Sequence, residues 1–104
     1  MSRMVVIYRT PKDPAAFDAH YFSVHVPLAK KLPGLRRYEV GRRPNITPAG
    51  DPEPYLIGTL YFDDIAALRH AFSTPEGRAC AEDRRVLAPE DDDVQMYLFD
   101  VTEV

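Results

Sequence analysis

The stretch that decides the fold is residues 18–40, DAHYFSVHVPLAKKLPGLRRYEV. It predicts an amphipathic helix, a tight turn at Pro33-Gly34, and a strand that opens with Leu35. The apolar side chains of the helix recur at helical spacing in one stripe, formed by Phe17, Tyr21, Val24, Leu28 and Leu32. His25 lies near that stripe, and the helix-disrupting Pro27 follows it by two residues. This setting is unusual for a helix that only packs, so we expect chemistry here.

The segments on either side complete an alternating pattern of strands and helices. Strands are predicted over residues 3–9, 35–43, 55–62 and 94–101. Asp13 is placed to cap the first helix, and two later helices are predicted after Asp63 or Asp64 and after Thr74, the last running to about Val86. Breakers make residues 44–54 an irregular loop, and residues 88–93 form an acidic one. The order βαββαβ, with a split second helix, predicts a ferredoxin-like α+β fold.

Three of the four predicted strands are apolar on both faces. In residues 55–62, for example, Tyr55, Ile57 and Tyr61 alternate with Leu56, Leu60 and Phe62. Helices on one side of a sheet cover one face only, and a face open to water would carry polar side chains. The simplest cover for the second face is the same sheet of another copy, so the pattern predicts a homodimer.

Composition narrows the class of protein. The 104 residues fit one domain, residues 1–104, and 45% hydrophobic with 28% charged residues is typical of a globular chain. The net charge of −3 argues against nucleic acid as the main partner. The apolar runs are too short to span a membrane and the first residues lack a signal-peptide pattern, which predicts a cytoplasmic protein. One cysteine excludes an internal disulfide and a multi-cysteine metal site.

Three pieces of the chain carry a resemblance to a known family: HVPL at 25–28, LPGLRRY at 32–38 and STPEGRACAED at 73–83. They resemble the EthD family, which is named for a component of a bacterial ethyl tert-butyl ether degradation system. The resemblance covers essentially the whole chain and implies a βαββαβ subunit whose sheet packs against its partner's in a dimeric α+β barrel. The wider relatives include lactone isomerases and polyketide cyclases. In the isomerase-like relatives, a helix histidine and a tyrosine on the next strand belong to the active site; these positions correspond to His25 and Tyr38. A cysteine that those relatives also use has no match in place at Cys80.

His25 and Tyr38 are therefore the candidate catalytic residues. On a regular helix His25 lies about 50° from the centre of the apolar stripe, which predicts a position at the edge of the stripe, partly exposed to solvent. The pKa range of histidine makes His25 the natural proton carrier. Pro27 has no N–H to donate to the carbonyl of Ser23, which predicts a kink of the helix beside His25. The phenol of Tyr38 is suited to donate to a developing oxyanion. The alternatives are a structural histidine bonded to backbone or to a strand residue, and a tyrosine that only packs.

The remaining candidates have plainer interpretations. A carboxylate-binding site and a solvated strand edge are both consistent with four arginines, Arg36, Arg37, Arg42 and Arg43. His20 and His70 are predicted at the surface, Tyr21 in the core, and Cys80 as a buried inert thiol. Tyr8, Tyr55, Tyr61 and Tyr97 are predicted to line a cavity or to lie in the core or interface. Asp91-Asp92-Asp93 lacks the further ligands and glycine of a calcium loop, so no metal site is predicted.

The leading functional hypothesis is cofactor-free proton transfer, an isomerisation or cyclisation, on a small apolar carbonyl or lactone compound. Catabolism of xenobiotic or aromatic compounds is the setting that the resemblance implies. Glycine-rich phosphate loops, G-x-S-x-G elbows and haem-attachment motifs are missing, so an oxidation would need a cofactor from outside. Two alternatives stay open: a non-catalytic protein that binds a small hydrophobic ligand or assists an oxygenase (oxidoreductase) system, and a structural dimer whose barrel is filled by side chains.

Overall fold

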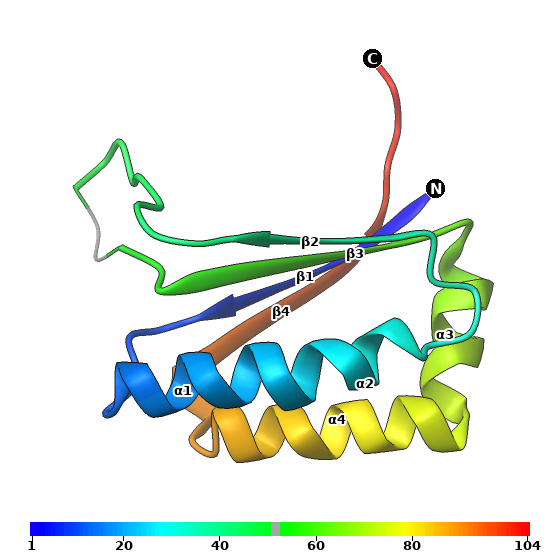
Figure 1. Ribbon diagram of the computed structural model, residues 1–104. Coiled ribbons are helices and arrows are strands. Elements are labelled where there is room, and N and C mark those ends of the chain that lie inside the picture. Colours follow the sequence, from blue (N-terminus) through cyan, green and yellow to red (C-terminus); the bar gives the residue numbers. More distant parts are fainter. Residues whose placement is uncertain (51–52) are drawn as a thin grey trace.

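The protein has two layers, an antiparallel four-stranded sheet and a set of helices on one of its faces (Figure 1). The computed structural model describes residues 1–50 and 53–104. The strands are β1 Ser2–Tyr8, β2 Arg37–Gly41, β3 Leu56–Phe62 and β4 Val94–Asp100, in the spatial order β2-β3-β1-β4. The helices are α1 Pro14–His20, η1 Tyr21–His25, α2 Val26–Lys30, α3 Ile65–Ser73, α4 Pro75–Leu87 and η2 Asp91–Asp93. The predicted ferredoxin-like βαββαβ fold with a split second helix is confirmed.

Three helices begin where the sequence predicted, at side chains that cap their first turn. Asp13 accepts a hydrogen bond from the amide of Ala16 (3.1 Å), and Asp64 accepts one from the amide of Ala67 (2.7 Å). Thr74 caps α4 through the amide of Gly77 (3.1 Å). These oxygens satisfy amides that have no partner within the helix, which fixes each start in the sequence. The predicted loop over 44–54 has a turn at Pro48-Ala49 and neither helix nor strand in its described part, and Pro52 lies outside the described residues.

The first helix is irregular in a different way from the kink that the sequence predicted beside Pro27. Its middle, η1, is a π-helical turn in which the amide of Val26 donates to the carbonyl of Tyr21. A π-helical turn holds one residue more than an α-helical turn, so every later side chain changes its phase. The predicted inward positions were Val24 and Leu28, yet the buried residues are His25 and Ala29. Val24 is 40% exposed. The irregularity predicted near Pro27 is therefore present, but as a phase shift.

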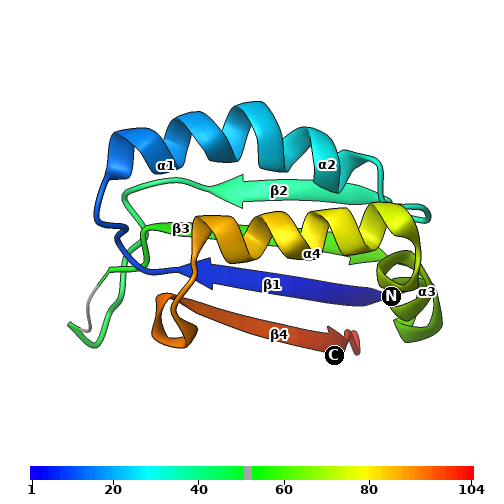
Figure 2. The same cartoon turned by 90° about the horizontal axis from the view of Figure 1, so that it is seen from below.

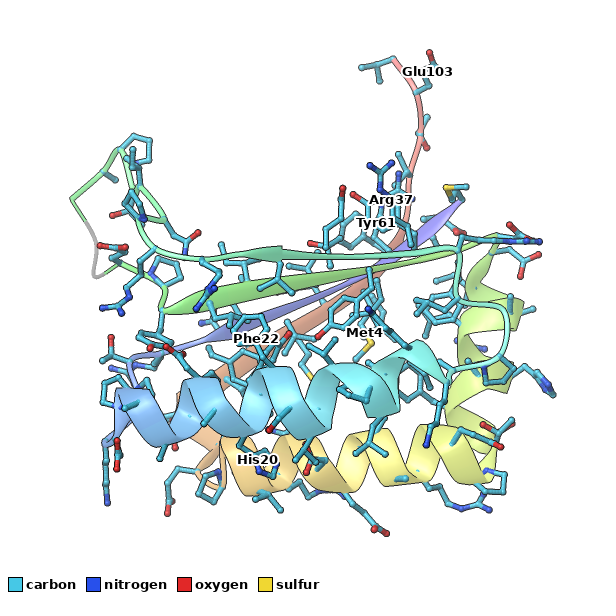
Figure 3. The ribbon with its side chains drawn as sticks, viewed as in Figure 1. Met4, His20, Phe22, Arg37, Tyr61 and Glu103 are labelled. Atoms are coloured by element: carbon cyan, nitrogen blue, oxygen red, sulfur yellow. The ribbon has the colours of Figure 1, made fainter. Side chains whose placement is uncertain are left out.

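The two faces of the sheet have different surroundings. Helices α1, α2 and α4 lie along one face, and α3 lies at one end of the sheet (Figure 2). The even-numbered residues of β1 and β3 point to the helices and are mostly buried. Met4 lies on this side, whereas Arg37 and Tyr61 project from the opposite face (Figure 3). That open face also carries Tyr97 and Phe99, which are 52% and 43% exposed.

Helices long and apolar enough to cross a membrane are absent from the described residues, 1–50 and 53–104.

Candidate active site

A cavity of about 180 Å³ lies between the sheet and the helices. The strands contribute Met4, Tyr8 and Tyr38 to its wall, and the helices contribute Tyr21, His25 and Cys80. An apolar cavity of roughly 150 Å³ is enough to hold benzene, so this space suits a compound of about one small ring. The two residues predicted as catalytic therefore line the same cavity.

His25 is buried, with 6% of its surface exposed, so the prediction that it is partly exposed at the edge of the apolar stripe was wrong. The π-helical turn is the reason, because it rotates residue 25 into the core. Nδ1 of His25 lies 2.9 Å from Oδ2 of Asp83 on α4, so the residue is bonded neither to backbone nor to a strand. Burial lowers the pKa of His25, and the Asp83 carboxylate opposes that shift only in part. The neutral ring donates from Nδ1, because a carboxylate only accepts, which leaves Nε2 as a base.

Tyr38 is joined to Tyr21 by a hydrogen bond between their hydroxyl oxygens. Burial raises the pKa of Tyr38 to about 12, and the hydrogen bond from Tyr21 lowers it somewhat. Burial also raises the pKa of Tyr21, and there the shared hydrogen bond adds to the increase. Either hydroxyl can donate in this bond, and with Tyr21 as the donor the proton of Tyr38 is available to another acceptor. Both phenols are protonated at neutral pH, and Tyr38 is equipped to donate to an oxygen in the cavity.

A glycine on β3 makes room for this tyrosine pair. A Cβ added at Gly58 would lie 3.1 Å from the hydroxyl oxygen of Tyr21 and 3.7 Å from Cε1 of Tyr38. Position 58 also lines the cavity. A larger side chain would push on the pair and fill part of the cavity, so the glycine leaves space for this site.

Three contributors to the site were not predicted from the sequence. Nε2 of His20, a residue expected at the surface, lies 2.7 Å from Oδ1 of Asp83. Tyr21 is buried, as predicted, but its hydroxyl also belongs to the cavity. Asp83 was noted only as the last residue of a family-like piece of sequence. A pair of histidines five residues apart gives no sign of a shared carboxylate, because a regular helix would turn them to different sides.

The other candidates lie where a structural role accounts for them. Cys80 is buried, as predicted, and burial raises the pKa of its thiol to about 11, so it is protonated at neutral pH. Arg36 makes a forked pair with Asp63 of its own chain, at 2.7 and 3.0 Å. Arg37 pairs with Glu39, while Arg42 and Arg43 stack over the rings of Phe22 and Tyr55. His70 is exposed, as predicted. In the part of the chain that the structure describes, acidic, histidine and cysteine side chains form no group of three suited to a metal ion.

The fold and the cavity define this chain as a ferredoxin-like α+β protein with a small, partly apolar site between sheet and helices. The sequence profile of the EthD domain matches residues 9–90. An uncharacterized 11.0 kDa protein from the thcB-thcC intergenic region of Rhodococcus erythropolis is 40% identical over 83 residues, 80% of each chain. The crystal structure of an ethyl tert-butyl ether d (EthD) family protein from Bacillus halodurans is 34% identical and superposes with a TM-score of 0.87, covering 98% of this chain and 99% of that one. The chain belongs to the EthD family, as the sequence predicted.

More distant structures share the fold alone. A dimeric ferredoxin-like protein of unknown function from Thermobifida fusca is 16% identical, with a TM-score of 0.71 over 96% of this chain and 90% of that one. SnoaB, a cofactor-independent oxygenase from Streptomyces nogalater, is 19% identical, with a TM-score of 0.68 over 99% of this chain and 94% of that one. Likeness at this level of identity shows the architecture and no activity.

Proposed function

We propose that this protein moves a proton on a small, largely apolar carbonyl or lactone compound without a cofactor, and that it does so in the cytoplasm as part of the catabolism of xenobiotic or aromatic compounds. In this proposal His25 is the base and Tyr38 holds the oxygen. Nε2 of His25 takes a proton from the carbon next to the carbonyl, and the electrons of that C–H bond move to the carbonyl oxygen as an enolate. Tyr38 donates to that oxygen. In an isomerisation His25 returns the proton to another carbon of the enolate; in a cyclisation the enolate carbon bonds to a second carbonyl carbon of the same compound, and His25 gives the proton to the alkoxide that forms.

The single observation that carries this proposal is a buried histidine, held at Nδ1 by Asp83, that lines the same small cavity as Tyr38. The ring of Tyr21 connects the two groups, with its centroid 5.3 Å from that of His25 and its hydroxyl bonded to Tyr38. The Asp83 carboxylate keeps the proton of His25 on Nδ1, and a catalytic base needs such a fixed tautomer because the other nitrogen must be free to accept a proton.

The test begins with native mass spectrometry of the protein taken from cells, which identifies a retained small molecule by its mass. Turnover of that class of compound is then compared in three variants. We expect His25→Ala to lose about 10²- to 10⁴-fold in kcat and Tyr38→Phe to lose about 10²-fold. His70→Ala, at an exposed histidine on α3, is the matched control. Unchanged turnover in His25→Ala would contradict the proposal.

A binding protein is the second candidate, because the cavity is mostly lined by apolar side chains and by hydroxyls that pair with each other. In this role the protein sequesters a small hydrophobic ligand or assists an oxygenase system. The same experiment distinguishes the two functions. Retention of the ligand by the unmodified protein and by His25→Ala, with no product in either, supports binding and excludes proton transfer.

We also propose that residues 1–104 act as one domain and pair with a second copy through the open face of the sheet. The support is the exposed aromatic side chains on that face, where Tyr97 of β4 stands beside Val5 of β1 and Phe99 stands beside Arg3. Sedimentation of the protein should give the mass of a dimer. Phe99→Asp should give a monomer, while Val86→Asp, at an exposed position of α4, should not. A monomer in the unmodified protein would contradict this part of the proposal.

A further inference from the structure

The Asp83 carboxylate connects two histidines. Oδ2 accepts from His25 at 2.9 Å, and Oδ1 accepts from His20 at 2.7 Å. The Asp83 side chain is 11% exposed, and a carboxylate so far from water needs a donor on each oxygen. His20 is 33% exposed and lies beside α4, at the outer end of this arrangement (Figure 3). The three side chains thus lead from the cavity to the surface.

The π-helical turn is what allows two histidines five residues apart to meet one carboxylate. In a regular α-helix they would point about 140° apart around the axis. The bond between the amide of Val26 and the carbonyl of Tyr21 closes a turn of five residues, so side chains five apart lie on the same side. His20 ends α1 and His25 ends η1, so the wide turn separates them and both face α4.

We propose that His20 is a positioning residue for His25. By donating to Oδ1, it holds the Asp83 carboxylate in the orientation in which Oδ2 accepts from Nδ1 of His25. That contact keeps the proton of His25 on Nδ1 and presents Nε2 to the cavity. Without His20, the Asp83 side chain is free to turn toward water or toward the neighbouring Arg84, and the His25 ring loses its fixed tautomer. The catalytic part of this inference rests on the proposed function; the part about the tautomer does not.

The test is the ¹⁵N NMR spectrum of histidine-labelled protein without ligand, which reports which ring nitrogen of His25 carries the proton. We expect a single Nδ1–H tautomer in the unmodified protein. His20→Phe keeps a ring but removes the donor, so the two nitrogens of His25 should move toward equal shifts. His20→Gln keeps an N–H near the position of Nε2 and should restore the original pattern. His70→Phe is the control. If the phenyl ring does not fit at position 20, His20→Leu is the donor-free variant used in its place.

An unchanged His25 tautomer in both donor-free variants would overturn the inference. With an identified substrate, His20→Phe should lower kcat about 10-fold with KM unchanged, and His20→Gln should retain the activity. A protein that turns over no compound would refute the proposed function, while the tautomer measurement would still decide the role of His20.

Discussion

The two helical segments are both interrupted in the middle, but in different ways. The segment that forms α3 and α4 turns a corner at Thr74, whose backbone is extended at φ −85° and ψ 164°. The segment that forms α1, η1 and α2 keeps a right-handed helical backbone throughout, as at Tyr21 with φ −56° and ψ −51°. A corner changes the direction of the chain, whereas a π-helical turn keeps the direction and changes which side chains face the core.

This difference matches the roles of the two segments. The corner at Thr74 allows α3 to cover one end of the sheet while α4 runs along its face (Figure 1). The π-helical turn buries His25 and allows it to share Asp83 with His20. The first interruption serves packing, and the second builds the candidate site. Substitutions in the two segments should therefore separate stability from site chemistry.

The largest effect is expected at the corner, from Gly77→Ala. A Cβ at position 77 would lie 2.2 Å from the carbonyl oxygen of Ala71 and 2.5 Å from Cα of Phe72, which are backbone atoms that cannot move without shifting α3. We expect a loss of about 3 kcal/mol in the free energy of unfolding. Urea denaturation measures it, with the exposed Glu76→Ala as a control that should stay near the original value. A loss below about 1 kcal/mol would show that α3 is free to adjust.

A smaller effect on stability, with a large one on the site, is expected from Gly58→Ala. The added methyl group would press on the Tyr21 hydroxyl at 3.1 Å and would enter the cavity. We expect a cost of about 1 to 2 kcal/mol together with loss of the retained ligand. Urea denaturation and native mass spectrometry measure the two quantities. Thr59→Ala, the next residue along β3 on the open face, should leave ligand retention intact.

The helix cap at the corner should contribute less again. Thr74→Ala removes the oxygen that accepts from the Gly77 amide, and we expect it to cost about 1 kcal/mol of stability with no change at the cavity. Thr74→Ser should recover most of that loss, because the hydroxyl is kept. Equal destabilisation by both substitutions would mean that the methyl group of Thr74, and not its hydroxyl, stabilises the corner.

The smallest effect concerns pH and arises only in the first segment. Burial lowers the pKa of His25 in the folded protein, so the unfolded chain takes up this proton more readily. The contribution of His25 to stability is therefore complete above the unfolded pKa of about 6.5 and is lost as the pH falls from there through the folded pKa. His25→Gln should flatten this part of a stability–pH curve measured by urea denaturation. A curve identical to that of the unmodified protein would contradict the assigned burial effect.

Local chemistry made much of the fold predictable. Caps at Asp13, Asp64 and Thr74 depend on side chains and amides a few residues apart, so their positions in the sequence suffice. The two-residue period of the strands showed apolar side chains on both faces of the sheet, which predicted that the helices leave one face open. The family-like pieces pointed to His25 and Tyr38, and these two side chains do line one cavity.

The chemistry of the site was decided by the tertiary structure. The sequence by itself determined the order of the strands and helices, the fold class, the family and two of the candidate residues, because these follow from periodicity, capping and motifs. The partners of those residues come from distant segments: Asp83 is 58 residues from His25, and Tyr38 is 17 residues from Tyr21. A one-residue widening of the first helix moved His25 from a predicted margin into the core. Pro27 predicted an irregularity near this point, but the phase of the later side chains and the Asp83 carboxylate that His25 meets follow from packing against α4, which local sequence does not record.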